Sequence, residues 1–180
     1  MTATEKPKSY TLEFEEKTTP VMVYMASGMV WGEVVHKEMV RVSFWLRAPI
    51  PPQIITVYDS QMLYTTGNNP PSTFSELHVP VSEILALHIL PPAHEPLDYD
   101  EMEPNRKMEP VTALAGAFRF DGKLRMATSS TVKKFLDVVK ENYTSLYDVH
   151  ASQPLRPNLK PLHVPFVLLR RETCIFSKPA

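Results

Sequence analysis

The sequence predicts a mainly β fold of the α+β class, in which two pseudo-symmetric β-rich units follow one another. Segments rich in Val, Ile, Tyr and Thr recur along the chain with alternating apolar and polar residues, as in half-buried strands. Similar residues also recur about 90 positions apart, which indicates an internal repeat. The clearest matches at this offset are Pro20-Val21 with Pro110-Val111, and Gly32 with Gly122.

A repeated tetrapeptide supports the same interpretation. Leu77-His78-Val79-Pro80 recurs as Leu162-His163-Val164-Pro165, so we expect His78 and His163 to occupy equivalent positions. The resulting division has an N-terminal tail over 1–19, a first repeat over 20–91, an acidic proline-rich linker over 92–109 and a second repeat over 110–177.

Each repeat is expected to contain a hairpin, a short helix and two or three further strands. In the first repeat, alternation predicts strands over 21–25, 29–35 and 53–63, and one or two strands over 77–90. In the second repeat the predicted strands are 111–120, 123–126, 143–150 and 162–176. Asp121-Gly122 is a type I′ turn signal, but its counterpart Trp31-Gly32 is not, so a glycine that bends a strand fits both repeats.

A helix is predicted between the second and third strands of the second repeat. Val132, Phe135, Leu136 and Val139 follow the i, i+3, i+4, i+7 spacing of an apolar helix face, and a preceding serine can cap the helix. The equivalent Val42, Trp45 and Leu46 keep this spacing, but Pro49 shortens the segment, which could equally form a strand. The bulky pairs Trp45-Leu46 and Phe135-Leu136 are expected to be buried between helix and sheet.

The composition is that of an ordinary globular protein, with 43% apolar and 22% charged residues. No apolar run reaches the roughly 18 residues that would cross a bilayer, and the first residues lack the order of a signal peptide. Cys174 is the single cysteine, so an internal disulfide is excluded. We expect a cytoplasmic protein without a membrane partner.

Charge divides the chain unequally although its net charge is only −1. Residues 1–108 hold 8 Lys and Arg against 14 Asp and Glu, whereas residues 109–180 hold 11 against 6. This asymmetry favours docking of the two halves against each other, with an acidic external partner as the alternative.

Several motifs resemble an uncharacterised bacterial domain family whose members carry a glycine in the second strand, an RLSDFLN-like helical turn and an F-L-x-L-x-D-V strand. In the first repeat these are Gly32-x-Val34, the segment 41–47 that reads RVSFWLR, and the segment 55–59 that reads ITVYD. In the second repeat the segments are 131–137 and 144–149. The resemblance implies the architecture and no activity. The first hairpin also resembles that of Sm-like or SH3-like small barrels, so a small-barrel-like unit is the alternative fold.

Candidate chemical sites are few. The equivalent His78 and His163 suggest a paired metal or acid-base site, but no Cys-His or His-x-x-x-His spacing accompanies them. Asp59 and Asp148 each follow a tyrosine near the end of a predicted strand, where an Asp usually accepts hydrogen bonds from the next turn. Cys174 lies in a strand pattern typical of a buried thiol. We therefore predict no catalytic, cofactor-binding or metal-binding residues.

The function that we expect is that of a non-catalytic binding or regulatory module that acts through protein–protein contacts, without a cofactor. The alternative is a nucleic-acid-binding protein that uses the basic face of the second repeat. A nearly neutral chain argues against this alternative, because nucleic-acid-binding proteins are usually basic. The cations of that face would be Arg119, Lys123, Arg125, Lys133, Lys134, Lys140, Arg156, Lys160, Arg170 and Arg171.

Overall fold

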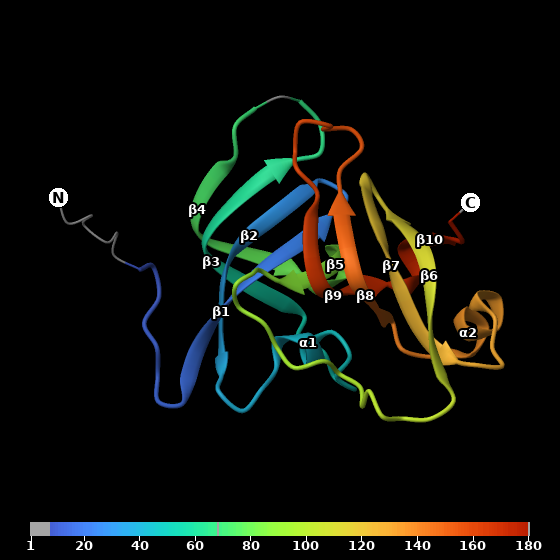
Figure 1. The fold of residues 1–180 in the computed structure, drawn as a ribbon. Helices are drawn as coiled ribbons and strands as arrows, with labels where there is room; N and C mark the ends of the chain where they lie inside the picture. The colour runs from blue at the N-terminus through green and yellow to red at the C-terminus, as the bar shows by residue number, and fades with distance from the viewer. Residues whose placement is uncertain (1–7, 68, 180) are drawn as a thin grey trace.

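The computed structural model describes residues 8–67 and 69–179 and confirms a mainly β fold. Ten antiparallel strands form one sheet in the order β10-β6-β7-β8-β9-β5-β1-β2-β3-β4 (Figure 1). The strands are β1 Glu16–Met25, β2 Gly28–Lys37, β3 Ile54–Tyr64, β4 Ser72–Pro80, β5 Ile84–Ile89, β6 Arg106–Ala115, β7 Phe118–Ala127, β8 Tyr143–Ser152, β9 Leu162–Arg170 and β10 Cys174–Ser177.

The sheet is open and strongly curled. Strands β4 and β10 are its two edges, and they lie on opposite sides of the molecule in Figure 1. In the described residues, β4 and β10 do not pair with each other, so the sheet does not close into a barrel. The small-barrel alternative is therefore wrong. In the described part of the chain, no helix is long and apolar enough to cross a membrane.

The two halves of the sheet have the same strand order. Strands β5-β1-β2-β3-β4 of the first half correspond to β10-β6-β7-β8-β9 of the second. The hairpin registers also agree, because Val21 is opposite Gly32 in the first half and Val111 is opposite Gly122 in the second. All ten strands nevertheless form one continuous sheet, joined where Ala86-Leu87 of β5 pairs with Leu168-Leu169 of β9. That the chain divides into two separate units stays a prediction.

The repeated tetrapeptide does not occupy equivalent positions. In β3–β4 His78 pairs with Thr56, whereas in β8–β9 His163 pairs with His150, which corresponds to Gln61. The position equivalent to His78 is therefore Leu168, five residues further along the strand. The expected equivalence of the two histidines is wrong, because a four-letter match carries no information about strand register.

The two strand glycines are required by close approach of the neighbouring strand. Both lie at register shifts, between β2 and β3 and between β7 and β8. A Cβ atom on Gly32 would lie 2.6 Å from the Tyr58 carbonyl oxygen, and one on Gly122 would lie 2.9 Å from the Tyr147 carbonyl oxygen. The strand-bend interpretation is confirmed, and Asp121-Gly122 is not a turn. Gly116 and Ala117 form the hairpin turn between the end of β6 and the start of β7. The predicted strand boundaries at 120 and 123 are therefore wrong.

Two apolar cores lie on the two faces of the sheet, and each contains residues of both halves. The first core, built mainly on β1 to β5, also contains Tyr143, Tyr147, Phe166 and Leu168. The second core, built mainly on β6 to β9, also contains Tyr24, Leu85 and Ala86. Strand β1 supplies both cores because its alternating side chains point to opposite faces.

The two helices differ in how deeply they pack. Helix α1, Val42–Trp45, is a single turn, but Val42 and the following Leu46 are fully buried in the first core. Helix α2, Val132–Val138, forms where predicted. Its cap is Thr131 and not the expected serine, because the Thr131 side chain accepts a hydrogen bond from the Lys134 backbone N–H (3.3 Å). No residue of α2 is buried. The expectation of deep burial is therefore confirmed for Leu46 and wrong for Trp45, Phe135 and Leu136, which are partly buried.

The acidic linker is anchored to the sheet. The Glu95 carboxylate accepts hydrogen bonds from the Val42 and Ser43 backbone N–H groups (2.7 and 3.2 Å) and so caps α1. The buried Asp98 carboxylate pairs with Arg47 (2.5 Å) and accepts a hydrogen bond from Tyr147 (2.6 Å). Figure 1 shows this segment running past α1 before β6 begins at Arg106, inside the predicted linker.

Candidate functional site: an acidic groove beside the N-terminal segment

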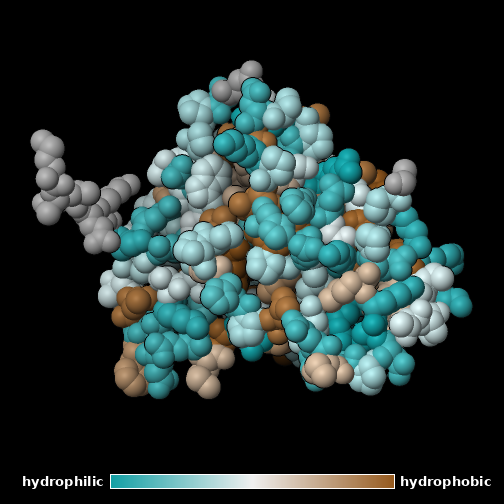
Figure 2. Space-filling model, viewed as in Figure 1, coloured by the Kyte–Doolittle hydropathy of each residue, from teal (hydrophilic) through white to brown (hydrophobic). Residues whose placement is uncertain are grey.

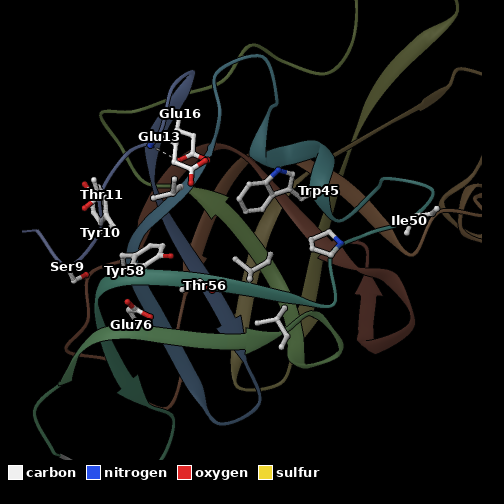
Figure 3. Close-up of a pocket in the computed structure, with 14 residues that line it drawn as sticks. Ser9, Tyr10, Thr11, Glu13, Glu16, Trp45, Ile50, Thr56, Tyr58 and Glu76 are labelled. Atoms are coloured by element: carbon white, nitrogen blue, oxygen red, sulfur yellow. Dashed lines mark hydrogen bonds between the residues drawn. The ribbon is translucent and has the colours of Figure 1, made fainter.

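An open groove of about 850 Å³ lies beside the N-terminal segment. Strand β3 forms its floor, and Figure 3 shows the N-terminal segment on one side and the α1–β3 connection on the other. We call it the acidic groove. Its lining residues are Ser9, Tyr10, Thr11, Glu13, Glu16, Val35, Trp45, Ile50, Pro52, Ile54, Ile55, Thr56, Tyr58 and Glu76.

The N-terminal wall is held in place by contacts with β2, β3 and β4. The Ser9 backbone N–H donates to Asp59 (3.3 Å), and the Ser9 hydroxyl donates to the Ser75 carbonyl (2.7 Å). The Tyr10 ring packs edge-on against Tyr58, with ring centroids 5.4 Å apart, and its hydroxyl donates to Glu33. Residues 9–16 of the predicted tail therefore form one wall of a preformed groove, and residues 1–7 of that tail lie outside the described part of the chain.

Apolar and aromatic side chains form the opposite wall. Trp45 is half-buried at the end of α1 and packs edge-on against His36, with ring centroids 5.7 Å apart. The buried His36 is itself fixed by a hydrogen bond with Thr19 (2.7 Å). The side chains of Ile50 and Ile54 remain exposed at the groove. A ligand that enters this space can therefore bury apolar surface.

The charge of the groove is negative. Its lining contains three carboxylates, those of Glu13, Glu16 and Glu76, and no Lys or Arg among the described residues. The Glu13 backbone N–H donates to the Glu16 carboxylate (2.9 Å), which lowers the pKa of Glu16 despite slight desolvation, and a nearby Lys37 (3.2 Å) adds to this effect. Lys37 also lies 3.8 Å from the Glu13 carboxylate, so one cation is shared by two of the three carboxylates. The groove keeps a net negative charge and attracts cations.

The histidines singled out in the sequence lie apart, and neither lines the acidic groove. His78 forms a hydrogen bond with Thr56 (3.0 Å). His163 forms a hydrogen bond with Asp148 (2.8 Å), which also pairs with Lys123 (2.7 Å). The lysine, with the histidine, lowers the pKa of Asp148 to about 2. Among the described residues, no group of three or more His, Cys, Asp or Glu side chains could hold a metal ion.

The sequence suggested that the two recurring aspartates lie at strand ends, and this is wrong. Asp59 and Asp148 lie inside β3 and β8, with positive φ angles of 45° and 52°. Each follows a tyrosine whose carbonyl oxygen approaches a strand glycine of the neighbouring strand, so the same irregularity occurs in both halves. The two aspartates belong to different halves. Among the described residues, no interaction joins their carboxylates. Burial raises the pKa of the Cys174 thiol to about 12, which keeps it protonated at neutral pH.

Most of the cations proposed for a nucleic-acid surface bind groups of the protein itself. Arg119 pairs with Asp121 (2.8 Å), Arg125 with Glu103 (2.6 Å) and Lys133 with Asp137 (3.0 Å). Arg170 and Arg171 donate to backbone carbonyls. Lys133 pairs within its own helix, and Arg171 donates to the Leu136 carbonyl of the second half. Arg170 contacts the first half, but its partner is the Ser82 backbone carbonyl and not an acidic group.

The acidic groove is not recognisable in the sequence, because five of its lining residues lie in the predicted tail. Ser9, Tyr10, Thr11, Glu13 and Glu16 show no apolar period, and an apolar period is what indicates an ordered segment. The presence of Tyr10, Leu12 and Phe14 among acidic residues was the available signal, since such large apolar side chains are unusual in a solvated tail.

Comparisons of this chain with protein-family models, with curated proteins and with solved structures find no match. The resemblance to an uncharacterised bacterial domain family accordingly stays a prediction.

Proposed function

We propose that this protein is a non-catalytic binding module that recognises an extended, basic segment of a partner protein in the acidic groove. The observation that carries the proposal is the lining of the groove, which combines three carboxylates with exposed apolar and aromatic side chains. Lys37 beside Glu13 and Glu16 balances one of these charges, so the groove stays net negative. Lysine and arginine suit such a surface because their charged ends pair with carboxylates while their methylene chains cover aromatic rings.

The shape of the groove favours an extended segment over a globular surface. The cavity is long enough to involve the N-terminal segment, β3, β4 and the α1–β3 connection (Figure 3). An extended peptide places alternate side chains on opposite sides, so basic residues can face Glu13 and Glu76 while apolar residues face Ile50 and Ile54. The negative charge of the first half, seen already in the sequence, is consistent with a cationic partner.

The test uses two pools of capped hexapeptides. In one pool lysine or arginine alternates with leucine or tyrosine, and in the other glutamate replaces the basic residues. A Trp31→Phe background leaves Trp45 as the single tryptophan, so its fluorescence reports on the groove. We expect saturable binding of the basic pool that weakens as salt is raised, and no binding of the acidic pool.

A double variant locates the binding. Glu13→Gln with Glu76→Gln should weaken binding of the basic pool about two- to fivefold for each carboxylate removed. The matched control is Glu101→Gln with Glu172→Gln, which removes the same charge at exposed positions outside the groove. Equal binding of both pools, or equal loss in the two double variants, would contradict the proposal. Binding of a mixed-sequence oligonucleotide at about 150 mM salt, unaffected by both double variants, would favour the nucleic-acid alternative instead.

A further inference from the structure

A second cavity of about 370 Å³ lies where the two halves of the sheet meet. Strands β1 and β2 form one wall, and residues of β7, β8 and β9 with the β8–β9 connection form the other. Its surface is mainly apolar and aromatic, with Met22, Met29, Trp31, Phe118 and Leu162 among the lining residues. We call it the junction cavity. This volume and lining are those of pockets that bind small organic molecules.

The walls of the junction cavity are held by packing that requires no ligand. Tyr24, which is 4% exposed, packs edge-on against Phe118, with ring centroids 4.8 Å apart. Its hydroxyl forms a hydrogen bond with the buried His88 (3.0 Å). Because the ring is fixed on both sides, the space beside it is preformed and does not depend on rearrangement of the core.

One lining residue is a buried amide with an unsatisfied oxygen. Gln153 is 6% exposed and lines the junction cavity, and its Oε1 atom has no hydrogen-bond partner among the residues that the structure describes. A buried polar group without a partner is costly, and most such groups in folded proteins are hydrogen-bonded. Rotation of the terminal amide can bring either its oxygen or its NH₂ group to the cavity. A hydroxyl can both donate and accept, so it can satisfy the amide in either orientation.

We propose that the junction cavity binds a compact, mainly apolar small molecule that carries one hydroxyl group, with an aromatic alcohol as the chemical class, and that the hydroxyl hydrogen-bonds to Gln153. The apolar walls bury the ring system, and the amide selects the polar group. Of the described residues that line the cavity, Lys160 is the one with a charge, and it is exposed. The ligand therefore needs no charged group in the interior.

This site is distinct from the acidic groove. The two cavities share no lining residue, and their chemistry is opposite, since one is apolar and the other carries three carboxylates. The junction cavity also contains residues of both halves, whereas the groove is built by the first half alone. A small molecule bound here would not compete directly with a basic peptide in the groove.

The experiment compares two probes with the same ring system. 2-Naphthol carries a hydroxyl group, whereas 2-methoxynaphthalene lacks the donor. Dissociation constants are measured by ligand-observed NMR with the full-length protein. We expect both probes to bind, and 2-naphthol to bind roughly three- to tenfold more tightly because its hydroxyl satisfies Gln153.

Variants then assign the preference to the amide. Gln153→Leu should abolish the preference while 2-methoxynaphthalene still binds, and Gln153→Met provides the same test should the leucine variant fail to fold. Gln61→Leu, which changes an exposed glutamine of β3 outside the cavity, should keep the wild-type preference. The proposal is overturned if neither probe binds the wild-type protein, if the two probes bind it equally, or if the preference survives in the Gln153 variants.

Discussion

At the scale of single residues, His88 shows how burial determines chemistry. Its side chain is 1% exposed, its Nδ1 forms a hydrogen bond with the Ile89 carbonyl (2.9 Å), and its Nε2 forms one with the Tyr24 hydroxyl (3.0 Å). A neutral imidazole donates through one nitrogen and accepts through the other, so both contacts fit the uncharged ring. Burial lowers the pKa of His88 to about 4, because the charged form would lose its hydration.

This histidine should make the stability depend on pH. In the unfolded chain the imidazole takes up a proton near its ordinary pKa of about 6.5, whereas in the folded protein it does so only near 4. The unfolded state therefore binds more protons between these values, and the free energy of unfolding should fall by about 2–3 kcal/mol between pH 7 and pH 4.5. Denaturant titrations at a series of pH values measure this loss.

A matched pair of variants separates His88 from the carboxylates that also titrate near pH 4.5. His88→Gln should flatten the dependence over this range, whereas His78→Gln, at an exposed position, should leave it unchanged. An unaltered slope in His88→Gln would show that other groups cause the pH dependence.

Single residues also show what sequence can predict. Gly32 and Gly122 were recognisable as strand-bend glycines because each occupies the same position in a matched segment, and the close carbonyl contacts confirm it. The positive φ angles of Asp59 and Asp148 were not predictable. Aspartate tolerates this conformation but does not require it, so only the register shift of the neighbouring strands reveals it.

At the scale of elements, the two helices occupy corresponding places but do not contribute equally. The pattern of Val132, Phe135 and Leu136 predicted α2 correctly, because amphipathic spacing is a local property. The predicted serine cap was wrong, since Thr131 is the N-cap. Its shallow packing was not predictable, since the sequence cannot tell how far the helix stands from the sheet. Helix α1 is shorter, but it is capped by Glu95 of the linker and delivers Leu46 to the core.

The burial of two equivalent leucines can be compared directly: Leu46 follows α1, and Leu136 lies within α2. Leu46 is 3% exposed, whereas Leu136 is only partly buried. Leu46→Ala should lower the free energy of unfolding by about 3 kcal/mol, because it leaves a cavity in the first core. Leu136→Ala should lower it by about 1 kcal/mol or less. Chemical denaturation of both variants measures the difference, and equal losses would show that α2 packs as deeply as α1.

At the scale of the whole molecule, the halves are tied together by the β5–β9 pairing and by shared cores. Tyr143 and Leu168 belong to the core of the first half, and Tyr24 belongs to that of the second. In addition, the Tyr143 hydroxyl donates to the Ile84 carbonyl (3.0 Å). Removal of one half would therefore expose apolar surface and leave unpaired strand edges on the other.

We accordingly expect the chain to unfold in a single transition. In a Trp31→Phe background, fluorescence of Trp45 reports on the first half, whereas far-ultraviolet circular dichroism reports on the whole sheet. The two signals should give coincident denaturation curves. The separate fragments 1–95 and 96–180 should not fold on their own. Two separated transitions, or an independently folded fragment, would instead support the two-unit division predicted from the sequence.

The sequence by itself determined the β class, the positions of most strands, the second helix and the paired glycines. Each of these follows from local periodicity or from matched spacing. Tertiary structure alone decided the strand register that separates His78 from His163, the joining of β5 to β9, and the placement of the N-terminal segment beside β3. The physical reason is that alternation specifies which face a side chain takes, whereas long-range pairing depends on bulges and contacts between segments far apart in the chain. Both cavities lie at such contacts and therefore emerged only from the fold.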